Sequence, residues 1–278
     1  PSQAIDRGIP PGTPGDPLRQ CTSVDQRNQP RPQDGDADGI ARCDRGAIET
    51  ATLSSSTYVV NLLDQDLIDN NPGDDRCDAQ AAAGDQCTLR AAVMEANAKP
   101  GPDRIQFVAP VGGQVIALTL AGPAGAHQGD LDISEQLTVD GVGAGLLLTA
   151  ISSSMGERIF DVDLPQAQVA RFQDLILSGG SSSGQGGAIR QSGPNSLEIE
   201  GVEFRTNAAT QGGGALAVTD SSVAVRDSHF EGNQAGERGS AILLISANLL
   251  VERSSFAANS NQGMVDRAAI RVEAGSAF

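Results

Sequence analysis

The sequence predicts an all-β fold, a right-handed parallel β-helix (a solenoid) with coils of about 26 residues. The first observation is a repeat of three phenylalanines, each followed three positions later by an asparagine: Phe204, Phe230 and Phe256, with Asn207, Asn233 and Asn259. The second is a run of small residues before each phenylalanine, such as Gly-Gly-Ala-Ile at 186–189. The third is that apolar and polar residues alternate between these landmarks. Self-similarity at a fixed spacing is typical of coils that stack on one another.

The residues within one repeat favour short strands over helices. Between residues 212 and 239, short apolar runs alternate with period two, and turns rich in Gly, Asn, Ser and Asp separate them. A helical repeat of this length would need apolar residues at a 3.6-residue period. Alternation predicts that the following side chains point into the core: Leu197, Ile199, Val202 and Phe204, then Val223, Val225 and Phe230, then Leu249, Val251 and Phe256.

The three asparagines keep their register with the phenylalanines. We expect Asn207, Asn233 and Asn259 to stack as a ladder, because an asparagine tolerates a left-handed corner and its amide can hydrogen-bond to the next coil. The alternative is that each is a turn residue only. Stacked side chains would lie roughly 4.8 Å apart, the separation of neighbouring strands. The glycines of the Gly-Gly-Ala-Ile run mark corners where backbones approach closely.

The composition excludes some classes of partner. The formal net charge is −16, which disfavours nucleic acid and anionic membranes. No apolar run approaches the ~20 residues of a membrane span, so we expect no membrane insertion. Tryptophan is absent and Tyr58 is the only tyrosine, which argues against a broad sugar-binding platform.

Four cysteines, Cys21, Cys43, Cys77 and Cys87, lie in the first third of the chain, outside the repeats. Four cysteines allow three pairings. We expect the local pairs Cys21–Cys43 and Cys77–Cys87, because each pair brackets a turn-rich loop. Zinc ligation is the alternative, weakened by the lack of a Cys-x-x-Cys motif. Disulfides predict an oxidising compartment, which means an extracellular or cell-surface location.

A capping region is expected at residues 51–104, followed by the β-helix at 105–278. The end of a solenoid exposes core and open strand edges, so it needs a cap. Thr88 suits the N-cap of a short helix at 88–97. One apolar face of this helix is predicted to contain Leu89, Ala92, Val93 and Ala96.

This region resembles the bacterial "CSLREA" β-helix family, named for its Cys-Ser-Leu-Arg-Glu-Ala motif. Here the motif is Cys87-Thr-Leu-Arg-Ala-Ala92, and Glu95-Ala-Asn97, Asp103-Arg-Ile105 and Gly129-Asp-Leu-Asp-Ile133 also fit. The resemblance covers about residues 56–278. It implies a secreted or surface-exposed bacterial β-helix with its helix at the N-terminal end, and it implies no established catalytic residues. The repeats are also similar to those of polymorphic outer-membrane adhesins.

Residues 1–50 are proline-rich, yet they resemble the closing segment that follows the last coil in the same family. The resemblance rests on Ala4–Gly8, Val24–Arg27, Pro30–Pro32 and Cys43–Glu49, and it departs at Asn28, where glycine is usual. At the other end, Ala268–Arg271 begins a new coil that the chain leaves unfinished at Phe278.

Two hypotheses explain this arrangement. In the first, the protein is one unit of a head-to-tail array, in which residues 1–50 complete the open C-terminal coil of a neighbouring copy by strand addition. In the second, the chain is a fragment of a longer multi-solenoid protein. Both predict an extracellular structural or adhesive β-helix. The first also predicts a second copy of the protein as partner, and a glycan or host-surface ligand is a further candidate partner.

An acidic run within residues 1–50 has two interpretations, a calcium loop and a solvated acidic turn. Asp34, Asp36 and Asp38 alternate and are followed by Gly39, which is how calcium loops arrange oxygen ligands. The twelfth position is Arg45 instead of Glu, so Asp44 or Glu49 would complete the site. The alternative is a solvated acidic turn. We favour the solvated interpretation for a second acidic group: Asp64, Asp66, Asp69, Asp74, Asp75 and Asp78.

The alternative function is a polysaccharide-active enzyme, a lyase or a glycosidase, because other β-helices host such enzymes. A glycosidase needs two carboxylates at a set separation. Stacked coils can place Asp161 or Asp163 beside Glu198 or Glu200, although every β-helix has such pairs by chance. Nothing in the sequence singles out these pairs, so the structural or adhesive function is the main hypothesis.

Overall fold

The computed structural model describes residues 55–63, 67–79, 86–108, 111–119, 129–141, 148–154, 156–165, 167–263 and 268–277. The chain divides into two units, Pro1–Ser54 and Ser55–Phe278, and all described residues belong to the second. Residues 1–50, with their predicted closing segment, therefore lie outside the described part.

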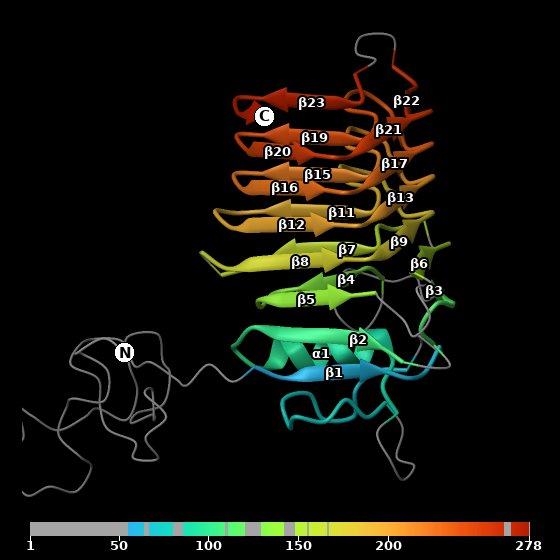
Figure 1. Cartoon of the computed structure of the whole chain (residues 1–278), viewed down its shortest axis with the longest axis vertical. Helices are drawn as coiled ribbons and strands as arrows, with labels where there is room; N and C mark the ends of the chain where they lie inside the picture. The colour runs from blue at the N-terminus through green and yellow to red at the C-terminus, as the bar shows by residue number, and fades with distance from the viewer. Residues whose placement is uncertain are drawn as a thin grey trace, which may run out of the picture. The chain divides into compact units, whose positions relative to one another are not determined.

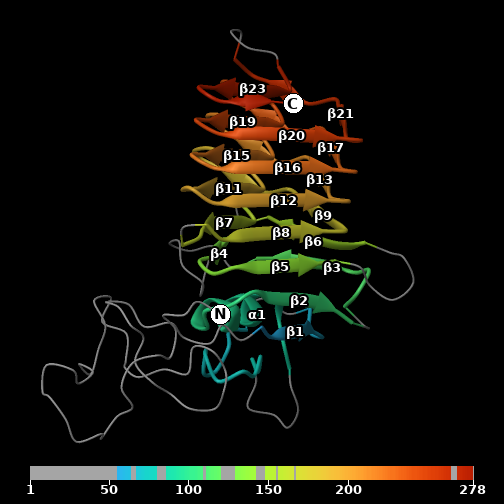
Figure 2. The ribbon, with the colours of Figure 1, turned by 60° about the vertical axis from the view of Figure 1, so that its left-hand side comes forward.

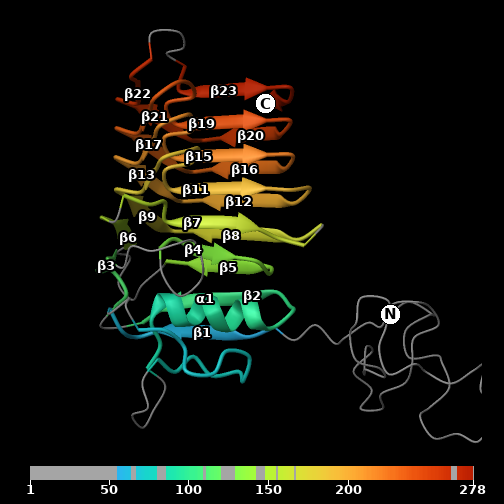
Figure 3. The same ribbon diagram turned by 180° about the vertical axis from the view of Figure 1, so that it is seen from behind.

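The second unit is the predicted parallel β-helix, with the helix at its N-terminal end (Figure 1). Strands of successive coils stack as rungs, which Figure 2 and Figure 3 show from two further sides. Each regular coil contributes one strand to each of four sheets, and the strands pair in parallel. Stacking in this way satisfies the backbone N–H and C=O groups of each strand from two neighbouring coils.

Two sheets contain most of the long strands. The long sheet contains, in order, β1 (Thr57–Val60), β2 (Asp103–Phe107), β5 (Leu137–Asp140), β8 (Val169–Gln173), β12 (Ser196–Glu200), β16 (Ser222–Arg226), β20 (Asn248–Glu252) and β24 (Ser276–Ala277). The acidic sheet contains β4 (Leu131–Ile133), β7 (Phe160–Asp163), β11 (Ile189–Ser192), β15 (Leu216–Thr219), β19 (Ile242–Ile245) and β23 (Ile270–Glu273).

The other two sheets form the narrow side of the coil. The phenylalanine sheet contains β3 (Val115–Leu118), β6 (Thr149–Ser153), β9 (Leu175–Ser178), β13 (Glu203–Arg205), β17 (His229–Glu231) and β21 (Ser255–Ala257). The short sheet contains β10 (Ser181–Ser182), β14 (Ala208–Ala209), β18 (Gln234–Ala235) and β22 (Ser260–Asn261).

The 26-residue spacing is the register of the phenylalanine sheet. Phe204 pairs with Phe230, and Phe230 pairs with Phe256. Their ring centroids are 4.5 Å and 4.8 Å apart, and the rings are nearly parallel. The repeated phenylalanine therefore fills the same place in the core of each coil, at the separation of neighbouring strands.

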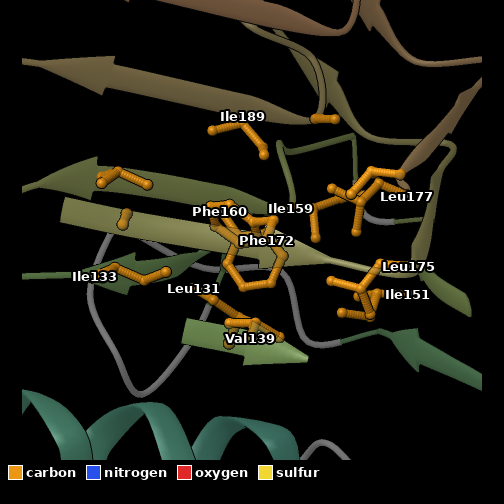
Figure 4. Packing of buried hydrophobic residues seen from close by; sticks show 14 of the residues in the cluster. Leu131, Ile133, Val139, Ile151, Ile159, Phe160, Phe172, Leu175, Leu177 and Ile189 are labelled. Carbon is orange, nitrogen blue, oxygen red and sulfur yellow. The ribbon is translucent and has the colours of Figure 1, made fainter. Parts of the chain in front are cut away.

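The core is a column of inward-facing side chains that continues through the coils. Figure 4 shows part of this column, where Phe160 and Phe172 lie together with Leu131, Leu177 and Ile189. The rings of Phe160 and Phe172 are 4.8 Å apart and tilted. The predicted inward residues are buried, except that Val251 and Phe256 are only partly buried.

The corners of the coil repeat one backbone conformation, with φ in the left-handed region. One column contains Gly179, Thr206, Gly232 and Ala258, at φ of 69°, 52°, 65° and 51°. Only glycine adopts this conformation without steric cost. At the next corner, a Cβ on Gly214 would lie 2.3 Å from the carbonyl oxygen of Ser240, so glycine is needed there for close approach.

Helix α1 (Leu89–Ala98) contacts β1, β2 and β4. Thr88 is its N-cap, and the side chain of Thr88 accepts a hydrogen bond from the N–H of Ala91 at 3.0 Å. The predicted helix was 88–97, and α1 begins and ends one residue later. It begins later because Thr88 is the N-cap and does not belong to the helix. Among the described residues, no helix is long and apolar enough to span a membrane.

Candidate functional site

The C-terminal end of the described β-helix is open. The strands β21, β22, β23 and β24 are each the last of their sheet within the described residues, so each has a strand neighbour on one side only. Apolar side chains near this end are only partly buried: Val251, Phe256, Ile270 and Val272. An unpaired strand edge presents N–H and C=O groups that can pair with another segment. This open edge is the first candidate binding surface.

The asparagine ladder runs up to this edge and has a direction. The Oδ1 atom of Asn233 accepts from the backbone N–H and the Nδ2 of Asn207, both at 3.0 Å. The Oδ1 atom of Asn259 accepts in the same way from Asn233, at 3.0 and 2.9 Å. Each Nδ2 also donates to a carbonyl of the preceding coil, as Asn259 does to Phe230 at 2.9 Å. Each coil therefore supplies acceptors to the coil before it.

A second ladder, of serines, has the same direction. The hydroxyl of Ser228 accepts from the N–H of Val202 at 3.1 Å, and the hydroxyl of Ser254 accepts from the N–H of Ser228 at 3.1 Å. Within the described residues, no hydrogen bond is formed by the backbone N–H of Ser254 or by that of Asn259. The open edge thus ends in two unpaired donors beside the ring of Phe256.

The N-terminal end is closed by polar side chains of α1. Arg90 donates to the carbonyl of Gly129 at 2.8 Å. Asn97 donates to the carbonyl of Asp132 at 2.7 Å and accepts from the N–H of Ser134 at 2.9 Å. These contacts hold the main chain of β4 and of the residues on either side of it against the helix. Arg90 and Asn97, which belong to the motifs that carry the family resemblance, therefore stabilise the capped end through hydrogen bonds.

Glu95 of α1 organises the loop before the helix. Its two carboxylate oxygens accept from the N–H of Gly73 at 2.5 Å and from the N–H of Asp75 at 2.6 Å. Glu95 is fully buried, and burial raises the pKa of its carboxyl. Burial also raises the pKa of Asp69, which accepts from Asn71 and Asp78, and that of Asp103.

The same loop is fixed by a disulfide. Cys77 and Cys87 are bonded, with their Cα atoms 5.0 Å apart. The predicted pairing is confirmed for these two residues, and zinc ligation by them is excluded. Cys21 and Cys43 lie outside the described residues, so their pairing stays a prediction.

An acidic cluster lies on the acidic sheet next to this end. One carboxylate oxygen from each of Asp130, Asp132 and Asp161 lies within 4.8 Å of the other two. Two guanidinium groups face them: Arg158 lies 3.0 Å from Asp130, and Arg190 pairs with Asp161 through two N–H groups. The ion pairs leave one net negative charge, which makes the cluster a weak cage for a divalent cation.

Asp132 has no hydrogen bond to its carboxylate within the described residues. Burial, with the charges of Asp130 and Asp161, raises the pKa of Asp132 from 3.8 to about 6. A hollow of about 180 Å³ lies beside the cluster, lined by Asp130, Gly156, Glu157, Arg158 and Ser181–Ser183. A carboxyl that titrates near pH 6 can donate a proton at near-neutral pH.

The strand pairing does not place Asp161 or Asp163 beside Glu198 or Glu200. The two aspartates lie on β7 in the acidic sheet, and the two glutamates lie on β12 in the long sheet. The stacking neighbours of Asp161 are Asp132 and Arg190, and the side chain of Glu198 pairs with Arg171 at 2.6 Å.

The sequence does not single out the cluster, because Asp130 and Asp132 stand there only as part of Gly-Asp-Leu-Asp-Ile. The signal for it is that these two aspartates alternate at the start of a strand, with Asp130 just before β4 and Asp132 within it, paired with Asp161.

The remaining predicted ion sites have different outcomes. The calcium loop of Asp34, Asp36, Asp38 and Asp44 lies outside the described residues, so it stays a prediction. Asp64 and Asp66 also lie outside. The other members of that acidic group bond locally and do not gather: Asp69 with backbone N–H groups, Asp74 with Asn71 and Arg76, Asp75 with Lys99, and Asp78 with Arg76.

Comparisons with protein-family models, with curated proteins and with solved structures give no match to this chain.

Proposed function

We propose that the protein is an extracellular structural or adhesive β-helix, a subunit or fragment of a head-to-tail surface filament or multi-solenoid adhesin. The stacked coils of the described β-helix carry this proposal, because a repetitive column suits a structural role. At the last described edge, β21 to β24 each have a strand neighbour on one side only, and Phe256 is partly buried. Residues 1–50 of a neighbouring copy would cover this edge by strand addition, as their resemblance to a closing segment suggests. Contacts of this kind do not close on themselves and give filaments.

Two further observations support the location and the class. The Cys77–Cys87 disulfide is of a kind that persists in oxidising compartments, which favours the cell exterior. The residues shared with the bacterial CSLREA-type proteins form a cap on the solenoid, and a capped, repetitive column suits a mechanical or display role. A glycan or a host-surface protein remains the proposed external ligand.

The test is self-association of the full chain. Purified protein is measured by light scattering across a hundredfold range of concentration and imaged by negative-stain electron microscopy. Linear oligomers that lengthen with concentration are expected, and a variant lacking residues 1–50 should stay monomeric. Full-length protein that is monomeric at every concentration would overturn the proposal.

A second candidate function is glycoside hydrolysis at the acidic cluster, favoured by the pKa of Asp132 at about 6. Asp132 would give its proton to the leaving oxygen while Asp161, held by Arg190, attacks the anomeric carbon. Carboxyl groups about 5 Å apart suit this retaining mechanism. Release of reducing ends from a panel of polysaccharides, lost in Asp132→Asn, tests it. The absence of release from every substrate would remove it.

A further inference from the structure

An exposed serine lies against a histidine on the outward face of the phenylalanine sheet. Ser255 of β21 and His229 of β17 pair in register on neighbouring strands (Figure 1). Phe230 and Phe256, the next residues along these strands, stack in the core, so His229 and Ser255 point outward. The Oγ of Ser255 lies 2.6 Å from the Nδ1 of His229. This separation is within the hydrogen-bond reach that a nucleophile and its general base require.

A carboxylate faces the other nitrogen of the same histidine. The Oε2 of Glu231, two residues after His229 on β17, lies 3.7 Å from the Nε2 of His229. Its charge favours the imidazole tautomer with the proton on Nε2, which leaves Nδ1 as the acceptor for the hydroxyl of Ser255. The other carboxylate next to His229, that of Glu203, is paired with Arg205. Glu231 is therefore a positioning residue that also stabilises the imidazolium formed when His229 takes a proton.

The surface around Ser255 restricts the class of substrate. The outward residues of β21 are Ser255 and Ala257, and both are exposed, so a substrate can reach the hydroxyl directly. Water reaches it as well, and water weakens the electrostatic stabilisation of a developing oxyanion. A nucleophile in such a setting reacts with acyl donors that carry a good leaving group. The matching substrate class is therefore an activated ester, such as an aryl ester.

We propose that Ser255 is a nucleophile activated by His229 and that it accepts acyl groups from activated esters. The hydroxyl proton passes to Nδ1 of His229 while Oγ forms a bond to the acyl carbon. The bond from this carbon to the leaving oxygen then breaks, and the imidazolium gives its proton to that oxygen. A water molecule, deprotonated by the same imidazole, hydrolyses the acyl-serine and releases the carboxylic acid. This chemistry is additional to the structural or adhesive role and does not depend on it.

Labelling of the full chain with a fluorophosphonate, a reagent for activated serines, tests the site. Peptide mass spectrometry should find the label on Ser255 about a hundredfold faster than on Ser260, the contribution of a general base. Ser260 is the matched serine, because it is also exposed but pairs in register with Gln234. His229→Gln should slow the labelling of Ser255 about a hundredfold. Glu231→Gln should slow it only about threefold, the effect of one surface charge.

Hydrolysis of p-nitrophenyl acetate gives a second readout. An initial burst of p-nitrophenol is expected from the wild type and from Ser260→Ala, and it should be lost in Ser255→Ala. All the substituted side chains point outward, so circular dichroism should show an unchanged fold in every variant. Equal labelling of Ser255 and Ser260, or equal labelling of Ser255 in the wild type and in His229→Gln, would overturn the proposal. The contact between Ser255 and His229 would then be cross-strand packing only.

Discussion

The two ends of the β-helix are finished in different ways. At the N-terminal end, α1 covers the core, and Val60, Leu89 and Val93 are almost fully buried. At the C-terminal end of the described residues, Phe256 and Ile270 remain partly exposed, although both are packed against the same core. The difference shows that the repeat does not itself provide an end. An end needs residues that leave the repeat pattern.

The capped end achieves this with side chains in place of strands. Arg90 bonds to the carbonyl of Gly129 just before β4, Asn97 bonds to the carbonyl of Asp132 within β4, and Glu95 accepts from two N–H groups of the loop. Charged groups are thereby buried, which costs desolvation energy.

The largest difference in the free energy of unfolding is expected between alanine variants of two phenylalanines in the same stack. Phe204→Ala should lower the free energy of unfolding by about 3–5 kcal/mol, because the side chain is fully buried and leaves a cavity. Phe256→Ala should cost less than about 2 kcal/mol, since the ring is already partly exposed and the site can relax. Chemical denaturation at a concentration too low for self-association measures both. Equal losses would mean that the open end is covered in solution.

The asparagine ladder gives a second contrast. Asn233→Ala should cost about 2–3 kcal/mol, because it leaves the buried N–H of Asn207 and the buried C=O of Phe204, both in the preceding coil, without partners. Asn259→Ala should cost about 1 kcal/mol, since water can reach the groups it exposes. Thermal unfolding of the two variants side by side measures the difference. A larger loss at Asn259 would contradict the direction of the ladder.

Acidic residues near the capped end predict that the free energy of unfolding decreases as the pH rises, which is the opposite of the usual effect of a carboxylate held in an ion pair. The pKa of Asp132 is raised in the folded protein, from 3.8 to about 6. The folded state thus binds the proton more tightly, so this contribution to stability is present below pH 3.8 and is lost as the pH rises to about 6. The contribution should be about 1–2 kcal/mol, reduced from the full shift because water screens a partly exposed carboxyl. The raised pKa values of Asp69, Glu95 and Asp103 act in the same direction.

The measurement is the melting temperature between pH 4 and pH 7 for the wild type and for Asp132→Asn, which should flatten the decline. The matched control is Asp227→Asn. The Arg253 guanidinium lowers the pKa of Asp227, so its contribution is present at neutral pH and lost in acid. An unchanged pH profile in Asp132→Asn would show that burial does not raise the pKa of this carboxyl.

The regular part of the fold follows from the sequence because its spacing is constant. Phe204, Phe230 and Phe256 are equally spaced and pair directly, so the period predicts the register. The acidic cluster was harder to predict because coil length changes near the cap. Asp132 and Asp161 pair although they are 29 residues apart, so a search at 26 residues misses them.

The backbone conformation at the corners is also hard to predict from the sequence. Glycine at a corner is readable from the sequence, but Thr206, Asp227, Arg253 and Ala258 also adopt positive φ. Aspartate tolerates the left-handed region, but nothing in the residue types of Thr206, Arg253 and Ala258 predicts it. The sequence therefore predicts where turns occur, and packing decides which residues bear their strain.

The smallest expected effect lies at one such corner near the open end. Ala258 has φ of 51° and its side chain is exposed, so Ala258→Gly removes steric strain and loses no buried contact. The gain should be about 0.5–1 kcal/mol, because the greater freedom of glycine in the unfolded chain offsets part of the relief. The neighbouring Ala257 is the matched control. It is also exposed but lies in β21 with an extended backbone, so Ala257→Gly should instead destabilise by a similar amount. Opposite signs in denaturant midpoints would show that the corner conformation persists up to the open edge, whereas destabilisation by both variants would mean that the last rung relaxes when no partner holds it.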